Sequence, residues 1–311
     1  MNYSKKYIVD LANKTGYIAQ NIEKSLRLLD TLEFIFTRSS FSDALSLKGG
    51  TAINLLFTNL QRLSVDIDLD YHRHLEKEKM AIDRNKIIHE LDDYMVSQGY
   101  SVSSKSREHA ILTSRTYSYI DASGNNDNIK VDINFIDRIT VYPLIKTPIN
   151  YFDQQMTITT PIKEELYGMK IAALLNRSKP RDLYDANGLF QHFDDIDVNK
   201  LRQLAIFYLS LDEVYAVDDS LYQEINRIKW IAVRKELFPV INRKENFNLQ
   251  KTQEYVIQNL REFLIIDCRE KEYLDEFSKG NYRPELLFND DAVTRAQKHP
   301  MAIWRTMHNQ K

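Results

Sequence analysis

The sequence is poor in the residues that build covalent frameworks and flexible linkers. Its 311 residues include one cysteine, eight glycines and seven prolines. A lone cysteine, Cys268, excludes an intramolecular disulfide and a four-thiolate zinc site and favours a reducing compartment. Because it lies in an apolar run, we expect a buried thiol. So few glycines and prolines argue against long flexible linkers.

Long hydrophobic runs and a surplus of one charge are also missing. No stretch of 18 apolar residues occurs, so no membrane-spanning helix is predicted. The first ten residues lack the apolar core of a signal peptide, so we expect a cytoplasmic protein. The 42 basic and 44 acidic residues give a formal net charge of −2. Any contact with nucleic acid would therefore depend on local patches.

The length and the hydrophobic pattern predict an α/β (α+β) protein of two domains. Apolar residues recur at helical or strand spacing, and they predict helices at 15–38, 52–57 and 76–97 and strands at 45–47, 62–70, within 100–122, and at 129–136. From Thr160 onward the pattern is helical. Thr160 is the expected N-cap of a helix that runs to Arg177, with Pro161 at its first position. The predicted domains are residues 1–155 and 156–311.

One predicted strand carries a row of carboxylates. Residues 62–70 alternate apolar and polar, so Asp66, Asp68 and Asp70 share a face. Asp66 and Asp68 are about 6.6 Å apart along a strand, within reach of one or two cations, and Asp132 could join from a neighbouring strand. All-oxygen ligands favour Mg²⁺ or Mn²⁺. The alternative is a solvated strand face with incidental acids.

A glycine pair precedes this strand. Gly49, Gly50 and Thr51 follow a short apolar segment and open a helical one. Glycines there would let backbone N–H groups approach a phosphate, and the helix N-terminus would favour the anion. A Gly-Gly pair by itself is usually only a turn. Beside the acidic strand, it predicts one element that binds phosphate and another that holds metal.

A lysine helix and its acidic continuation form a second constellation. Lys170 and Arg177 fall on one face of a helix that also carries Leu and Ala. Two cations there indicate a partly buried anion contact, for which triphosphate oxygens are suitable. Asp182 or Asp185 could orient Lys170 or accept a proton from an attacking hydroxyl. The alternative is a surface helix start, with Asp near the positive end of the dipole.

A run of cations in the last third of the chain is a candidate RNA-binding patch. It surrounds Trp230 and consists of Arg227, Lys229, Arg234, Lys235, Arg243 and Lys244. RNA binding would need such a basic surface and would depend steeply on salt. The alternative is an ordinary solvated helix with an incidental charge run.

Together these segments resemble the AbiEii family, the nucleotidyltransferase-like toxins of bacterial type IV toxin–antitoxin and abortive-infection systems, which are related to the MenT toxins. The resemblance rests on Gly49 to Thr51, residues 62–69, residues 131–133, residues 170–174 with Arg177, and residues 181–185; the tail segments 284–288 and 299–304 also fit.

The resemblance implies a DNA polymerase β-like nucleotidyltransferase core with a mostly helical C-terminal domain. It implies transfer of a nucleoside monophosphate from an NTP, with Mg²⁺ and loss of pyrophosphate. In some members the acceptor is the 3′ end of tRNA. It also implies a cognate antitoxin encoded nearby and a bacterial cytoplasm.

The resemblance also suggests roles for individual residues. Asp66 and Asp68 would be metal ligands, and Ser64 would lie beside the phosphates. Lys170 would contact the triphosphate, and Asp185 (or Asp182) would be the acidic residue of the third motif. The remaining matches are Gly49, Gly50, Thr51 and Arg177 for nucleotide binding, and Asp132 for metal binding.

Two other functions stay open from the sequence. One is a non-catalytic, nucleotide-binding relative, and the other is a transferase with a small molecule or a protein as acceptor. A binder needs none of the metal chemistry, so the joint presence of Asp66, Asp68, Asp132, Lys170 and Asp185 favours an enzyme.

Overall fold

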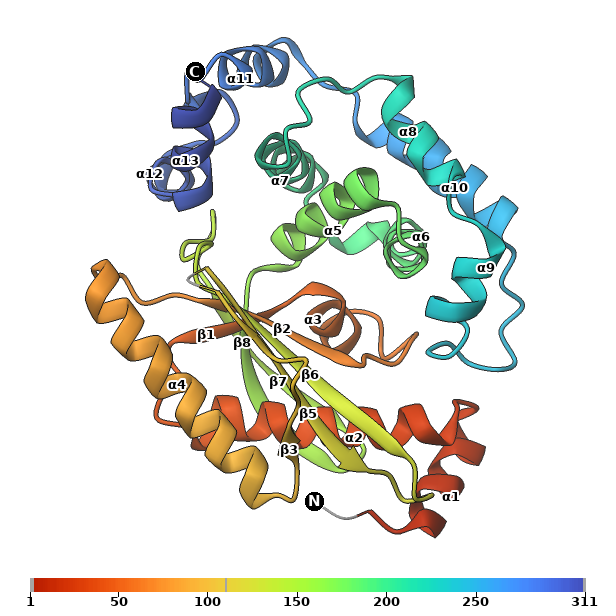
Figure 1. Cartoon of the computed structure of the whole chain (residues 1–311). Coiled ribbons are helices and arrows are strands. Elements are labelled where there is room, and N and C mark those ends of the chain that lie inside the picture. The colour runs from red at the N-terminus through yellow and green to blue at the C-terminus, as the bar shows by residue number, and fades with distance from the viewer. Residues whose placement is uncertain (1–2, 110, 310–311) are drawn as a thin grey trace. The chain divides into compact units, whose positions relative to one another are not determined.

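The computed structural model describes residues 3–109 and 111–309, which form two compact units (Figure 1). Unit 1 contains Met1–Arg138, Ile145–Thr160 and Pro239–Glu245. Unit 2 contains Ile139–Leu144, Pro161–Phe238 and Asn246–Lys311. The chain enters unit 2 three times, after Arg138, after Thr160 and after Glu245.

Unit 1 is built on a mixed sheet of six strands in the order β1-β2-β6-β5-β3, with β4 paired to β5. The strands are β1 (Leu45–Lys48), β2 (Asp66–Tyr71), β3 (Ser101–Val102), β4 (Arg107–Glu108), β5 (Leu112–Ile120) and β6 (Asn126–Asn134). β2 is antiparallel to β1 and parallel to β6. A separate antiparallel hairpin, β7 (Ile145–Tyr151) and β8 (Gln154–Thr160), completes the strands of the described residues.

The two faces of this sheet differ in polarity. On one face the side chains of Ile67, Leu69 and Val131 are fully buried. Helices α2 (Ala19–Glu33) and α4 (Lys77–Ser97) cover that face, and the hydroxyl of Tyr117 on β5 donates to Asp92 on α4. The acidic residues of β2 point to the opposite face. The alternation predicted for this strand is confirmed.

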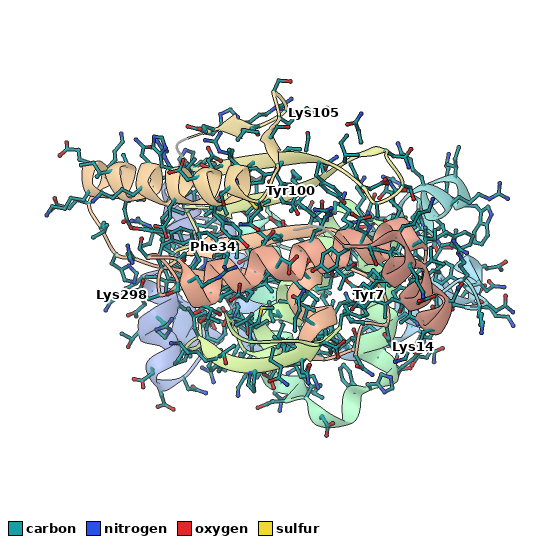
Figure 2. The ribbon with its side chains drawn as sticks, turned by 90° about the horizontal axis from the view of Figure 1, so that it is seen from below. Tyr7, Lys14, Phe34, Tyr100, Lys105 and Lys298 are labelled. Carbon is teal, nitrogen blue, oxygen red and sulfur yellow. The ribbon has the colours of Figure 1, made fainter. Side chains whose placement is uncertain are left out.

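The first helical segment differs from the prediction. A continuous helix over 15–38 was expected, but α1 (Lys5–Thr15) ends at Gly16, which has a φ of +82°, and α2 begins at Ala19. A π-helix, η1 (Phe34–Arg38), follows α2. Phe34, labelled in Figure 2, stacks on Tyr94 of α4, with ring centroids 3.7 Å apart. This stacking joins α4 to η1, which directly follows α2.

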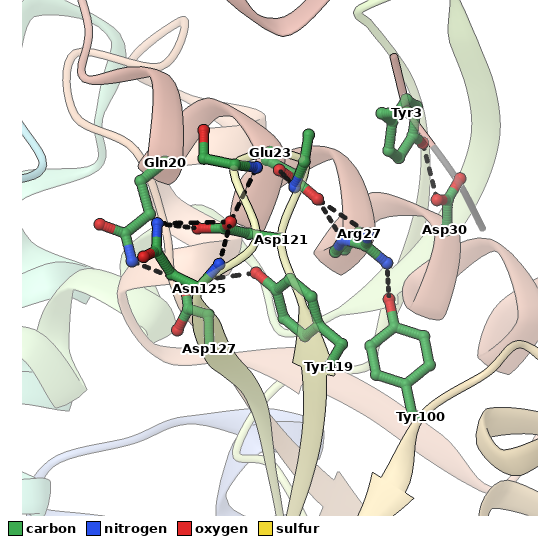
Figure 3. Close-up of polar contacts among 12 residues, drawn as sticks. Tyr3, Gln20, Glu23, Arg27, Asp30, Tyr100, Tyr119, Asp121, Asn125 and Asp127 are labelled. Atoms are coloured by element: carbon green, nitrogen blue, oxygen red, sulfur yellow. Dashed lines mark hydrogen bonds and ion pairs between the residues drawn. The ribbon is translucent and has the colours of Figure 1, made fainter. Parts of the chain in front are cut away.

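A buried charged cluster fixes α2 to the sheet (Figure 3). Arg27 pairs with Glu23 one turn earlier (Nη2 to Oε1, 2.8 Å). The guanidinium lies 4.1 Å from the centroid of the Tyr119 ring and also donates to the Tyr100 hydroxyl. The other oxygen of Glu23 accepts the backbone N–H of Ala122, in the turn between β5 and β6. The cluster therefore joins α2 to the strand hairpin that carries Asp132.

A late segment of the chain is part of unit 1. The carbonyl of Val240 accepts the backbone N–H of Leu63 (2.7 Å), just before β2. The side-chain amide of Asn242 donates to the Thr15 carbonyl (2.8 Å) at the end of α1. Residues 239–245 thus support both the start of the chain and the approach to the acidic strand.

Among the described residues, unit 2 is helical. Its elements are α5 (Lys163–Arg177), α6 (Pro180–Gln191), η2 (Phe193–Asp195), α7 (Val198–Leu211), α8 (Asp219–Asn226), α9 (Trp230–Ala232), η3 (Val233–Leu237), α10 (Leu249–Phe263), α11 (Cys268–Ser278), η4 (Pro284–Leu286), α12 (Asp290–Gln297) and α13 (Pro300–Asn309). A Cβ added to Gly168 would lie 2.9 Å from the Cβ of Leu204, so glycine lets α5 pack closely on α7. The prediction of a mixed α/β fold is confirmed.

Two local predictions are wrong. Thr160 is the last residue of β8 rather than an N-cap, and α5 has Ile162 at its N-cap position. Cys268, the first residue of α11, is exposed rather than buried. Across the parts of the chain that can be described, every helix is too short or too polar to cross a membrane.

Candidate active site

The glycine turn and the acidic strand meet in unit 1. β1 leads directly into helix α3 (Gly49–Leu56), which begins at Gly49 rather than at the predicted residue 52. Gly49 has a φ of +69°, which favours glycine. A Cβ at this position would lie 2.7 Å from Oδ2 of Asp68. Glycine is therefore required both by the backbone conformation and by the close approach of the carboxylate.

Side chains near this turn tie α3 to β2. The Thr51 hydroxyl donates to the carbonyl oxygen of Asp66 (2.5 Å). This bond uses the hydroxyl hydrogen of Thr51. Its backbone N–H lies in the first turn of α3, where N–H groups lack an intrahelical acceptor, and is the group that would donate to a phosphate. Ser64, just before β2, is buried, and its hydroxyl oxygen has no hydrogen-bond partner among the described residues. An unsatisfied buried hydroxyl is a group that a ligand oxygen could bind.

Asp132 lies beside Asp68. The parallel pairing of β2 and β6 puts these two aspartates directly opposite each other, and their side chains leave the same face. Oδ2 of Asp132 is 2.5 Å from the ammonium of Lys130. Its Oδ1 is buried and has no hydrogen-bond partner within 3–109 and 111–309. Sheet pairing, which the sequence could not supply, brings the two acids together.

Two lysines on the same face balance these acids, and the sequence analysis assigned neither of them a role. Lys48 pairs with Asp70 (2.5 Å) and is opposite Asp68 across the β1–β2 pair. Burial raises the pKa of Asp70 to about 7; Lys48 opposes this shift. For Lys130, burial lowers the pKa, but Asp132, Asp66 and Asp68 outweigh it and raise the pKa. The alternation that placed Asp132 on this face placed Lys130 there too.

The donor set fits a hard cation. Asp66, Asp68 and Asp132 offer carboxylate oxygens. Oδ1 of Asp132, which has no hydrogen-bond partner among the described residues, would be satisfied by a cation. No cluster of three or more His, Cys, Asp or Glu side chains in the described part of the chain is arranged to hold a metal. Mg²⁺ does not need one, since it usually binds one or two carboxylates together with waters and substrate phosphates.

The second constellation is assembled within unit 2. The ammonium of Lys170 on α5 is 2.8 Å from Oδ1 of Asp182 and 3.0 Å from Oδ2 of Asp185, both on α6. All three side chains are at most 6% exposed. Arg177, at the end of α5, donates to the outer oxygen of Asp182 (2.8 Å) and is itself 59% exposed. Both acids therefore contact the lysine.

The charges of this cluster compensate one another. Burial by itself would raise the pKa of Asp182, but Lys170 and Arg177 outweigh burial and lower the pKa to about 2. Asp182 is therefore ionised throughout the physiological range, and Lys170 is held between two carboxylates. The inward arrangement of α6 excludes the alternative of a solvated helix start.

A mixed sheet with acids on one face and a glycine turn beside them is the arrangement expected of a nucleotidyltransferase. A family model, described as nucleotidyl transferase AbiEii toxin of type IV toxin–antitoxin systems, matches residues 32–259. The chain belongs to this family, and it is a nucleotidyltransferase.

The structure is also similar to that of MenT4, a nucleotidyltransferase toxin from Mycobacterium tuberculosis H37Rv. The TM-score is 0.66 over the full length of both chains, at 13% sequence identity. At that identity the similarity establishes the fold alone, a nucleotidyltransferase toxin fold. No curated protein matches the sequence.

Proposed function

We propose that this toxin transfers a nucleoside monophosphate from an NTP to the 3′ hydroxyl of an RNA, with tRNA as the acceptor, and that it needs Mg²⁺ or Mn²⁺. The observation that carries the proposal is the fit of Gly49 against the Asp68 carboxylate, with Asp132 in register beside it. A phosphate-binding turn and hard-cation ligands in direct contact suit a metal-bound triphosphate.

The proposed reaction forms one bond and breaks another. The acceptor oxygen bonds to the α-phosphorus, the bond to the bridging oxygen breaks, and pyrophosphate leaves. Bound divalent metal would neutralise charge on the triphosphate. Asp66, Asp68 and Asp132 would hold it, while the turn from Gly49 to Thr51 and Ser64 would bind phosphate oxygens.

The proposal gives the unit 2 cluster a role in binding and positioning. Lys170 and the exposed Arg177 would bind the triphosphate. Asp182 and Asp185 would hold the Lys170 ammonium in place, and one of them would accept the proton of the acceptor hydroxyl. The proposal also includes a cognate antitoxin protein and a reaction in the bacterial cytoplasm.

The proposal is tested by incubating the protein with each α-labelled NTP, total RNA and Mg²⁺ and separating the products on a gel. We expect label in the tRNA band, and none when the metal is chelated. Asp66→Asn and Asp68→Asn keep the side-chain shape but remove the charge, so each variant should lose transfer. Asp10→Asn, at an exposed position on α1, is the matched control.

Undiminished transfer by either strand variant would reject the assignment of the acids. Label on the protein itself would indicate self-modification, and label on no macromolecule would indicate a small-molecule acceptor or a non-catalytic binder. Either of the last two results would overturn the RNA proposal.

A further inference from the structure

Unit 2 presents a compact basic surface around one exposed tryptophan. It is formed by α9, η3 and the residues just before them, and we call it the Trp230 patch: Arg227, Lys229, Trp230, Ile231, Arg234 and Lys235. All six are exposed. Arg243 and Lys244, considered with them from the sequence, belong to unit 1 and are not part of it.

The cations of the patch are available to a partner. Lys229, Arg234 and Lys235 have no ion pair with any residue that the structure describes, and Arg227 pairs only at the rim, with Glu224 one turn earlier. No acidic residue interrupts residues 227–235. The patch is therefore complementary to a polyanion.

The apolar residues of the patch indicate which kind of polyanion it binds. The Trp230 ring is 38% exposed and Ile231 is 77% exposed. The edge-to-face contact with Phe238, 5.2 Å between ring centroids, holds the indole in place. A fixed, exposed aromatic among cations is the arrangement on which unpaired bases stack while the cations bind the backbone. Bases that are paired and stacked inside a duplex could not stack on the indole.

The patch is attached to the element that carries the buried acids. Arg181 donates from Nε to the backbone carbonyl of Glu236 in η3 (2.8 Å). Arg181 directly precedes Asp182, which contacts Lys170. Helix α6 of unit 2 therefore contacts both the segment that carries the patch, through Arg181, and the Lys170 ammonium, through Asp182.

We propose that the Trp230 patch binds the unpaired nucleotides next to the acceptor end of the RNA, with a base stacked on Trp230 and phosphates on Lys229 and Arg234. This inference rests on the proposed RNA transferase function. It adds the part of the RNA that is recognised and the residues that recognise it.

RNA binding can be measured by tryptophan fluorescence, because the chain has only two tryptophans. In Trp304→Phe, Trp230 is the sole tryptophan. We expect a single-stranded RNA oligonucleotide to quench its fluorescence. In Trp230→Phe, the remaining Trp304, also exposed, is the matched control and should not respond. A blunt RNA duplex should quench Trp230 much less.

Steady-state kinetics and the salt dependence of binding give the second test. Trp230→Ala should raise KM for the RNA acceptor about tenfold with little change in KM for the NTP. Lys229→Gln with Arg234→Gln, at exposed positions, should weaken binding and make its salt dependence shallower by about one unit per lost phosphate contact. Trp304→Ala should change neither quantity.

The outcomes separate this inference from the proposed function. If the protein labels RNA but Trp230 is not quenched and both patch variants keep their KM, the patch assignment is wrong while the function stands. If oligonucleotide quenches Trp230 but no RNA is labelled, the patch binds RNA and the transferase proposal fails. Quenching by polyglutamate but not by RNA would indicate an acidic protein partner and would overturn the inference.

Discussion

Asp182 is the residue on which the charge balance of the unit 2 cluster depends. Its carboxylate contacts both Lys170 and Arg177, and its pKa is lowered to about 2 from an ordinary 3.8. A group whose pKa is lowered by folding stabilises the protein above its unfolded pKa. That stabilisation is lost as the pH falls toward the folded pKa. Here the window lies between about pH 4 and pH 2.

We expect Asp182→Asn to lower the free energy of unfolding by about 2 kcal/mol at pH 7, because a shift of nearly two pKa units is lost with the charge. The deficit should shrink as the pH falls below 4. Urea unfolding at several pH values would measure it, with Asp275→Asn, at an exposed site on α11, as the control. A deficit that stayed constant from pH 7 to pH 3 would contradict the prediction.

Gly49 provides a second test at the residue scale. Gly49→Ala and Gly99→Ala both replace a glycine of positive φ (+69° and +87°), so both should cost about 1–2 kcal/mol of stability. Only at Gly49 does the added methyl meet the Asp68 carboxylate; at Gly99 it would enter open space.

Label transfer should therefore fall about a hundredfold in Gly49→Ala, since displacing a reactive group by about 1 Å has that effect. In Gly99→Ala it should stay near the wild-type rate. Similar activity of the two variants would show that the Asp68 position does not matter.

At the scale of elements, α2 holds the β5–β6 hairpin through the Glu23–Arg27 cluster. Arg27→Met would leave the Glu23 carboxylate buried and unpaired, so we expect a loss of about 3–5 kcal/mol of stability. The double variant Glu23→Gln with Arg27→Met leaves no buried charge and should recover part of that loss.

Arg38→Met is the matched control for Arg27→Met. Arg38 also lies over an aromatic ring and pairs with a glutamate, but its side chain is 51% exposed. Chemical denaturation should therefore show a loss of less than about 1 kcal/mol. Equal losses at positions 27 and 38 would contradict the assignment of a buried, stabilising role to the cluster.

Elements with strong periodicity were predictable from the sequence, and those set by context were not. The helix predicted at 76–97 matches α4 to within one residue, because its apolar stripe is regular. The β7–β8 hairpin was missed, since its first strand is mostly exposed and contains Pro148. Thr160 was misassigned because a residue before proline is extended both at a strand end and at an N-cap.

The candidate site was likewise predictable from the sequence only in part. Alternation along β2 and β6 was enough to place Asp66, Asp68 and Asp132 on polar faces. The order of the strands, which sets Asp68 beside Asp132, depends on long-range pairing that a single sequence does not encode locally. Lys48 and Lys130 were overlooked as partners of these acids for the same reason, because their importance comes from what lies across the sheet.

At the scale of the whole molecule, the two units do not correspond to two halves of the chain. The chain passes between them after residues 138, 144, 160, 238 and 245. In unit 2, the short segment Ile139–Leu144 is held by Glu165, whose two oxygens accept the backbone N–H groups of Val141 (2.6 Å) and Tyr142 (3.0 Å). Burial raises the pKa of Glu165 to about 7. The sequence analysis assigned Glu165 no role.

The return of residues 239–245 to unit 1 has a consequence for biosynthesis. During translation, Leu63 and Thr15 cannot reach their partners Val240 and Asn242 until the ribosome has passed residue 245 of the 311. The nascent toxin therefore lacks these supporting contacts until most of the chain has been made, and a prematurely released N-terminal fragment would lack the segment that supports the approach to β2.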